Sequence, residues 1–247
     1  MRTRLFRQPL DVITMTCAEE LVKTAFLNSS RLKVVTLNPE MIVNARKNLE
    51  FQAAINNADL IIPDGVGVVW AMKVLSNGNL DTLERIPGIE LAEKILELAS
   101  RLNKKVVIFG GKKDILEKAI NELKKKYQKL QLLKAIDGYK KDFSKVADDL
   151  AQDKPDVVLV ALGSPKQEIW ISKYCSLFPQ SIMIGIGGSL DVWSGSKKRA
   201  PELFRKLNLE WLFRTAVEPK RIIRLIKTVP IFLWMVAKAS LQTKLVF

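Results

Sequence analysis

Short apolar runs alternate with amphipathic segments along the first 195 residues. The runs are dense in Val, Ile and Leu and end in Gly, Pro, Asn or Asp, whereas the segments between them carry apolar residues at helical spacing. Strands buried on both faces have such continuous apolar runs, and helices between them are typical of a parallel sheet. We expect strands within residues 11–15, 31–38, 58–64, 104–111, 130–138, 155–163 and 181–188. We expect helices over residues 19–27, 39–57, 89–102, 113–129, 144–151 and 166–177.

This alternation predicts an α/β fold with a largely parallel, Rossmann-like sheet and helices on both faces. Ligands of such sheets bind outside the carboxyl ends of the strands, so the residues after each predicted strand are candidate site residues. They are rich in glycine and small polar residues, and include Thr36, Asn38, Asp64, Gly110, Gly111, Gly163, Gly187 and Gly188. At the end of any one strand, the turn into the next helix favours Gly, Asn and Asp for steric reasons alone. Several of them at one edge favour a pocket whose backbone approaches a ligand closely.

Residues 77–90, NGNLDTLERIPGIE, have few periodic apolar positions and predict a loop before the next helix. A long loop at the strand-end edge is more often functional than a short one. This loop carries Arg85, a candidate cation for an anionic substrate.

The last 52 residues differ in character from the rest. They predict helices without strands, and they hold twelve Lys and Arg residues against three acids, an excess of nine in a chain of net charge +14. We therefore divide the chain into an α/β catalytic core, residues 1–195, and a basic amphipathic helical appendage, residues 196–247. So large a positive charge favours an anionic partner, which is a nucleic acid, a phosphorylated ligand or an anionic membrane face.

An apolar run over residues 229–237 favours the membrane among these partners. The run is nine residues long, whereas a helix that crosses a bilayer needs about 20. Basic residues precede it, and Phe232 and Trp234 lie within it, so the pattern favours a membrane-associating helix that lies in the interface. The alternative is a basic helix packed onto the core or onto a second copy of the chain.

The absence of histidine narrows the possible chemistry. The chain has no His and only two, widely separated cysteines, Cys17 and Cys175. Ser-His-Asp, Cys-His and histidine–metal sites are therefore excluded, and a reducing compartment is favoured. The N-terminus lacks the apolar stretch of a secretory signal. Any general base must be Asp, Glu, Lys, Tyr or Cys; Asp64 is the best candidate, and a helix N-cap is its structural alternative.

The glycines after Asp64 do not form a dinucleotide site. That fingerprint requires G-x-G-x-x-G, and Trp70 occupies the place of the third glycine. Neither a P-loop nor an Asp-x-Asp pattern occurs, so we predict no cofactor and no metal site. A bound diphosphate would then be stabilised by Arg, Lys, backbone N–H groups and helix N-termini.

Several motifs at defined spacings carry a family resemblance over essentially the whole chain. They are ADLIIPDGVGVVWA at 58–71, PDVVLVALGSPKQEIWI at 155–171 and GIGGSLDVWSGSKKRAPELFRKLNLEWLFR at 185–214. In these segments the chain resembles the WecG/TagA/CpsF family, glycosyltransferase family 26. The resemblance implies inverting, metal-independent transfer of N-acetylmannosamine from UDP-ManNAc to the 4-hydroxyl of GlcNAc on undecaprenyl diphosphate. The product would be the ManNAc-β-(1→4)-GlcNAc linkage unit of wall teichoic acid.

The resemblance also implies partners and a location. The partners are the UDP-sugar donor, the polyprenyl-diphosphate-linked GlcNAc acceptor and an anionic membrane surface, with no nucleic acid; a homo-oligomer is compatible with it. The implied location is cytoplasmic, peripheral on the inner face of the cell membrane.

Roles for individual residues follow from the same resemblance. Asp64 matches the general base that deprotonates the acceptor hydroxyl, and Arg85 matches a loop arginine that offsets charge on the leaving diphosphate. Thr36 and Asn38 match contacts near the reacting centre. Gln167 matches a polar residue at the mouth of the pocket.

The remaining matches belong to the nucleoside site and the appendage. Gly187, Gly188 and Asp191 lie where the nucleoside is expected. In the appendage, the matching residues are Arg214, Arg221 and Arg224. The resemblance implies that these basic residues close over the active site and contact the lipid diphosphate.

The sequence leaves several matters open. Relatives use ManNAc, its uronic acid or glucose, so the donor sugar is not fixed, and neither are the oligomeric state, the position of the appendage and the role of Lys112 and Lys113. A nucleic-acid-binding module and an oxidoreductase are the competing function classes. The positive charge lies beside an apolar segment, which argues against nucleic-acid binding. The lack of the third glycine in the dinucleotide-binding pattern argues against an oxidoreductase.

Overall fold

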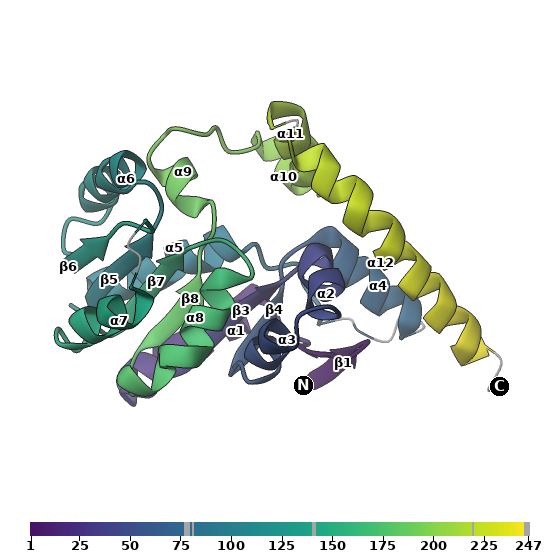
Figure 1. The fold of residues 1–247 in the computed structure, drawn as a ribbon, viewed down its shortest axis with the longest axis horizontal. Coiled ribbons are helices and arrows are strands. Elements are labelled where there is room, and N and C mark those ends of the chain that lie inside the picture. The colour runs from purple at the N-terminus through teal and green to yellow at the C-terminus, as the bar shows by residue number, and fades with distance from the viewer. Residues whose placement is uncertain (77–79, 81, 140–141, 219, 245–247) are drawn as a thin grey trace.

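The centre of the molecule is a six-stranded sheet in which neighbouring strands are parallel (Figure 1). In spatial order its strands are β4 (Leu60–Pro63), β3 (Leu32–Leu37), β8 (Ile182–Gly185), β7 (Val157–Ala161), β5 (Lys105–Gly110) and β6 (Gln131–Ile136). The structure is a computed structural model that describes residues 1–76, 80, 82–139, 142–218 and 220–244. Because the strands are parallel, their carboxyl ends meet at one edge, and the predicted α/β fold is confirmed.

Helices cover both faces of the sheet, as the apolar strands predicted. Along β5, Val106 and Ile108 join the core under α1 (Met15–Leu27), α5 (Gly88–Arg101) and α6 (Lys113–Lys126). Val107 and Phe109 point to the opposite face, in the core under α7 (Phe143–Ala151) and α8 (Lys166–Tyr174). That face continues under α2 (Pro39–Ala45), α3 (Leu49–Asn56) and α4 (Val66–Leu75).

The N-terminal strand was predicted in the wrong place. Residues 11–15 do not join the sheet; β1 (Arg2–Leu5) and β2 (Gln8–Asp11) form a separate antiparallel hairpin, and α1 begins at Met15. β2 ends at Asp11, whose carboxylate accepts hydrogen bonds from Arg2 and from the Ile61 N–H, at 2.8 Å each, and so joins the hairpin to β4. Thr14 then caps α1, since its hydroxyl oxygen accepts from the N–H of Cys17.

The single helix expected over residues 39–57 is two helices. α2 ends at Ala45, and α3 begins at Leu49 after the N-cap Asn48, whose side chain accepts from the Phe51 N–H at 2.9 Å. A side chain that caps a new helix competes with continuation of the old one, and the apolar periodicity does not show this local competition.

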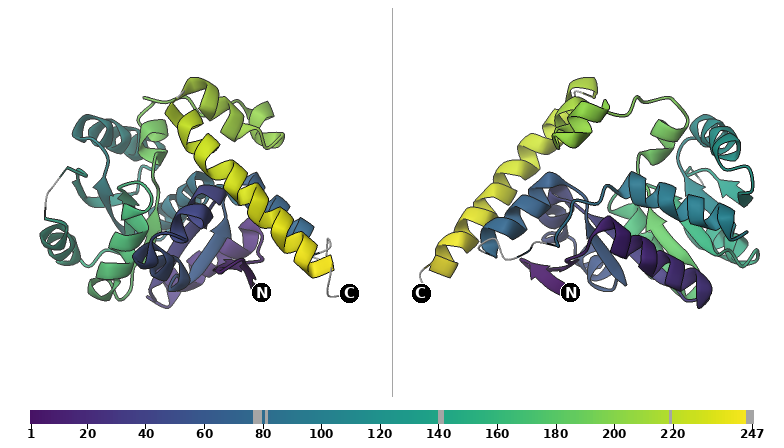
Figure 2. Two further views of the ribbon diagram at one scale, coloured as in Figure 1. Left: turned by 45° about the vertical axis from the view of Figure 1, so that its right-hand side comes forward. Right: turned by 180° about the vertical axis from the view of Figure 1, so that it is seen from behind.

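The appendage lies on the side of the sheet where the strands end. After the 3-10 turn η1 (Cys175–Leu177), β8 and α9 (Ser189–Trp193), the chain crosses to α10 (Glu202–Lys206) and α11 (Glu210–Val217) (Figure 1). The long helix α12 (Lys220–Lys244) then returns along α2 and α4, as both views in Figure 2 show.

Only one face of α12 packs on the core. Phe232 and Val236 are buried there, and the ring of Phe232 meets that of Phe6 edge-on at 6.1 Å. The other face exposes apolar side chains, among them Ile223, Ile226 and Trp234. No helix in the described part of the chain combines the length and the apolar character needed to cross a membrane.

Candidate active site

Asp64 stands at the carboxyl end of β4, at the strand-end edge of the sheet. Its N–H donates to the Leu37 carbonyl oxygen at 2.9 Å, which places it beside the end of β3. Helix α4 begins after Gly65 and has no side-chain cap hydrogen bond. The carboxylate of Asp64 is therefore not used as the N-cap, which was its structural alternative.

The turn after Asp64 requires both glycines. Gly65 has φ +146, a conformation that L side chains rarely adopt, and a Cβ on Gly67 would lie 2.8 Å from Pro39 Cγ. These two glycines turn the chain and let α4 pack closely, while Asp64 remains beside Thr36 and Asn38.

The surroundings of Asp64 change its acidity. The pKa of Asp64 is about 6, above its ordinary value of 3.8, because the effect of burial is the largest. The positive charges of Arg85 and Arg214 and a backbone hydrogen bond from Gly88 act in the opposite direction and lower the pKa. The nearby Glu210 carboxylate acts to raise it. A carboxylate with a pKa near neutrality is suited to accept a proton from a hydroxyl group in the transition state.

Two predicted site residues and one unpredicted residue close around this carboxylate. Thr36 is buried in β3, and Asn38 caps α2 by accepting from the Met41 N–H at 3.0 Å. Gly88, at the start of α5, packs so closely that a Cβ on it would lie 2.8 Å from Thr36 Cγ2 and 3.2 Å from Asp64 Oδ2. Sequence reasoning missed Gly88, although the Pro-Gly pair at the start of a helix is a visible signal.

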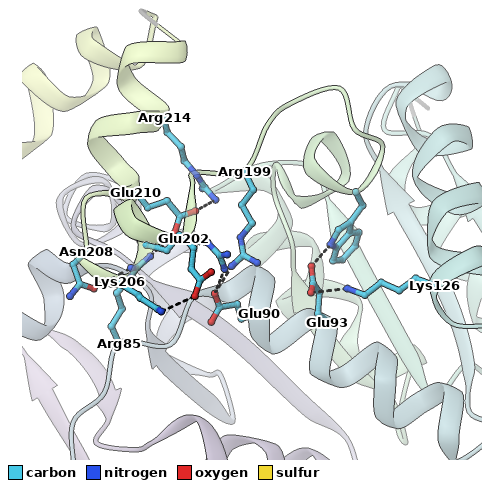
Figure 3. Close-up of polar contacts among 12 residues, drawn as sticks. Arg85, Glu90, Glu93, Lys126, Arg199, Glu202, Lys206, Asn208, Glu210 and Arg214 are labelled. Carbon is cyan, nitrogen blue, oxygen red and sulfur yellow. Dashed lines mark hydrogen bonds and ion pairs between the residues drawn. The ribbon is translucent and has the colours of Figure 1, made fainter.

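Arg85 and Arg214 meet from opposite parts of the chain. Arg85 Nη2 donates to Glu210 Oε2 at 2.8 Å, its Nη1 donates to Asn208 Oδ1 at 3.2 Å, and Arg214 forms an ion pair with Glu210 Oε1 (Figure 3). The structure thus brings the loop arginine and one appendage arginine to the same carboxylate. Sequence reasoning also missed Glu210, although it is one of three acids in a strongly basic segment.

The other two appendage arginines lie on α12. Arg221 is partly buried, and this burial and the charge of Arg214 lower its pKa. Arg224 is exposed. The positive charge of the appendage therefore extends from Arg214 along the start of α12.

A pocket of about 300 Å³ lies between the start of α5 and the helices α10 and α11. Its lining has three cations and three acids besides Pro87 and Asn208; they are Arg85, Arg205, Lys206, Glu90, Glu202 and Glu210. Ion pairs link Lys206 to Glu202 at 2.8 Å and Arg199 to Glu90 (Figure 3). Opposite charges are thus balanced in this pocket.

A second group of predicted residues gathers at the ends of β5, β7 and β8. Gly110 and Gly111 have φ +126 and +73, and a Cβ on Gly110 would lie 2.4 Å from the Ala161 backbone. Gly163 has φ +74 and open space beside its Cα. A bare backbone at these ends can approach a flat or phosphorylated ligand closely.

Gln167, which the resemblance places at the mouth of the pocket, has a buried side chain. It is 5% exposed; its Oε1 accepts from the Gly187 N–H at 3.0 Å, and its Nε2 donates to Glu168 Oε1 at 2.7 Å. Glu168 is also buried, and burial raises its pKa. The amide therefore ties α8 to the loop after β8, where Gly187 has φ +46.

Asp191 connects this loop to the appendage. It lies in α9 beside Gly188, and its carboxylate is 3.5 Å from Lys197 Nζ. Lys197 also pairs with Glu218, between α11 and α12, at 2.9 Å. Lys197 thus links the expected nucleoside side to the C-terminal end of α11.

Comparison with known proteins agrees with these features. The profile of the glycosyl transferase WecG/TagA/CpsF family matches residues 3–245. The chain is 37% identical over 218 residues to the N-acetylglucosaminyldiphosphoundecaprenol N-acetyl-beta-D-mannosaminyltransferase of Bacillus spizizenii, covering 88% of this chain and 83% of that protein. It is 38% identical over 236 residues to the protein of the same name in Staphylococcus aureus, covering 95% and 91%.

The region matched by the family profile contains Asp64 at the end of its strand, Arg85 in its loop and Arg214 in the appendage. A chain matched over nearly its whole length, with relatives at this level of identity, shares their fold and ancestry. The protein belongs to the WecG/TagA/CpsF family of glycosyl transferases.

Proposed function

We propose that the protein transfers N-acetylmannosamine from UDP-ManNAc to the 4-hydroxyl of GlcNAc carried on undecaprenyl diphosphate, with inversion and without a metal ion. One observation carries this proposal: Asp64, with a pKa of about 6, lies under two arginines at the carboxyl edge of the sheet. The names of the Bacillus and Staphylococcus relatives support the same acceptor and sugar.

The chemistry is a single displacement. Asp64 accepts the proton of the GlcNAc 4-hydroxyl while that oxygen forms a bond to the anomeric carbon of ManNAc. The bond from this carbon to the diphosphate oxygen breaks, and UDP leaves with the electron pair. Attack from the face opposite the leaving group inverts the anomeric carbon and gives a β-linked disaccharide.

The charge that develops on UDP requires cations, because no Asp-x-Asp pattern is present to hold a divalent ion. Arg85 and Arg214 are the cations next to Asp64. Arg221 and Arg224 extend this positive charge along α12, toward the diphosphate of the lipid acceptor.

The exposed face of α12 supports work at a membrane surface. Apolar side chains, with Ile226 67% exposed and Trp234 56% exposed, share this helix with Arg224, Lys227 and Lys238. An amphipathic helix of this kind binds anionic lipid by burying apolar area and attracting headgroups. We place the enzyme at the inner face of the cell membrane, where it would meet its lipid-linked acceptor.

The experiment that tests this function offers a panel of UDP-sugars with a short-chain lipid-diphosphate GlcNAc acceptor. We expect UDP-ManNAc to give a disaccharide lipid with a β linkage by NMR, and EDTA to leave the rate unchanged. Preference for UDP-glucose or the UDP-ManNAc uronic acid would assign a different transferase of the same family. Loss of activity in EDTA would contradict the metal-free displacement.

A further inference from the structure

Glu210 holds two arginines that the proposed chemistry needs for a diphosphate. Its side chain is 6% exposed, Oε2 accepts from Arg85 at 2.8 Å, and Oε1 is ion-paired with Arg214 (Figure 3). One arginine comes from the loop before α5 and the other from α11, so this carboxylate joins the appendage to the core directly beside Asp64.

The cations gathered here repel one another when Glu210 is absent. The charges of Arg85, Arg199 and Arg214 all act on the Glu210 carboxylate, and they overcome the effect of burial to lower its pKa. The charge of Arg214 likewise lowers the pKa of the Arg221 guanidinium. A buried anion between these cations therefore stabilises the contact of α11 with the core.

The same two arginines do not use all of their hydrogen-bonding groups and surface within the protein. Arg85 uses Nη1 and Nη2 for Asn208 and Glu210, while its Nε is buried and has no hydrogen-bond partner among the described residues. Arg214 keeps about a third of its side-chain surface exposed. Both can therefore rebind to a ligand that offers more oxygen atoms and more negative charge than one carboxylate.

We propose that Glu210 is an internal stand-in for the diphosphate: it keeps Arg85 and Arg214 together over Asp64 in the empty enzyme and releases them when a diphosphate binds. The inference rests on the proposed function, and it makes Glu210 a positioning residue, because it acts through the two arginines and not on the reacting atoms. When the diphosphate leaves with the product, the carboxylate takes the arginines back.

The exchange predicts that removal of the Glu210 charge strengthens diphosphate binding. The full-length protein and its Glu210→Gln, Glu210→Asp and Glu202→Gln variants are titrated with two probes by calorimetry. UDP represents the donor, and geranyl diphosphate represents the lipid acceptor. We expect Glu210→Gln to bind at least one probe about tenfold more tightly than the parent, since the competing anion is gone. The probe that gains affinity identifies which diphosphate Glu210 imitates.

The two other variants separate this effect from general changes of charge or fold. Glu202 pairs with Lys206 in the same pocket but touches neither arginine, so Glu202→Gln is expected to leave the affinities within about twofold. Glu210→Asp keeps the charge on a shorter side chain, and we expect affinities close to those of the parent. Should Glu210→Gln bind both probes as weakly as the parent, or more weakly, the inference is wrong.

Limited proteolysis of residues 196–201 supplies a readout that does not depend on affinity. Without ligand, Glu210→Gln is expected to be cleaved faster than the parent, because the arginines repel one another and α11 lifts from the core. Saturating diphosphate should restore protection, whereas a purely structural defect would leave cleavage fast with ligand bound. The sugar panel tests the proposed function separately, since a different donor sugar would leave these diphosphate results unchanged.

Discussion

Gly88 lies against the carboxylate of Asp64 so closely that a Cβ on Gly88 would stand 3.2 Å from Oδ2. The same Cβ would stand 2.8 Å from Thr36 Cγ2. We therefore expect Gly88→Ala to displace the carboxylate and lower kcat about 100-fold or more, as measured by disaccharide formation. Combining it with Thr36→Ser removes the Cγ2 methyl and should recover most of the lost thermal stability but less of the activity. Activity of Gly88→Ala within about twofold of the parent would show that the position of this carboxylate is not critical.

The pKa of Asp64 predicts the pH dependence of the reaction. A general base must be ionised, so kcat/KM should rise about tenfold per pH unit below about 6 and level off above it. Arg85 lowers the pKa of Asp64, so Arg85→Gln should move the inflection to higher pH besides slowing the reaction. A profile that is flat between pH 5 and 8 would contradict the raised pKa of Asp64, because a base with an ordinary aspartate pKa is ionised throughout that range.

The same shift predicts that the catalytic charge destabilises the fold. The pKa of Asp64 is about 6 in the folded protein and near 3.8 when unfolded, so the folded state holds this proton more tightly. The cost of ionising Asp64 is absent below about pH 3.8, grows as the pH rises and is complete above about pH 6. We expect Asp64→Asn to raise the free energy of unfolding at pH 7.5 by about 1–2 kcal/mol, and by less at pH 4.5. Denaturant unfolding at both pH values measures this difference. An Asp64→Asn variant less stable than the parent at pH 7.5 would show that the favourable interactions of the ionised carboxylate exceed the cost of burying it.

The double use of the Gln167 amide predicts a structural contribution from that residue. Gln167→Ala would leave the Gly187 N–H and the buried Glu168 carboxylate without their partner, so we expect a loss of about 2–4 kcal/mol in unfolding free energy together with weaker UDP binding. Glu168→Gln keeps an acceptor for Gln167 Nε2 and should cost much less. Unchanged stability in Gln167→Ala, with activity lost, would indicate that the amide acts on the substrate.

The two faces of α12 predict two separable effects. Ile226 is 67% exposed, so Ile226→Glu should reduce sedimentation with anionic phospholipid vesicles and leave the melting temperature unchanged. Phe232 is 2% exposed against Phe6, so Phe232→Ala should lower stability by about 3–5 kcal/mol or speed hydrogen exchange across α12. Equal vesicle binding by Ile226→Glu and the parent would argue for a different occupant of the exposed face.

Local patterns determined most of the fold and only part of the site. Apolar runs located the six sheet strands, because burial on both faces demands continuous Val, Ile and Leu; only the edge strand β6 among them lacks a fully buried residue. They could not distinguish β2 from the start of α1, where the hydroxyl of Thr14 and the carboxylate of Asp11 decide the boundary. They also did not reveal that Asn48 starts a new helix.

The sequence by itself determined that Asp64 follows a buried strand, that histidine chemistry is absent and that positive charge is concentrated after residue 195. Only the tertiary structure decided what surrounds Asp64, because Gly88 and Glu210 reach it from positions 24 and 146 residues further along the chain. The pKa of a carboxylate depends on burial and on charges a few ångströms away. No pattern of neighbouring residues contains those distances, so the sequence could single out Asp64 as a candidate base but could not give the pKa that its burial, the loop and the appendage confer on it.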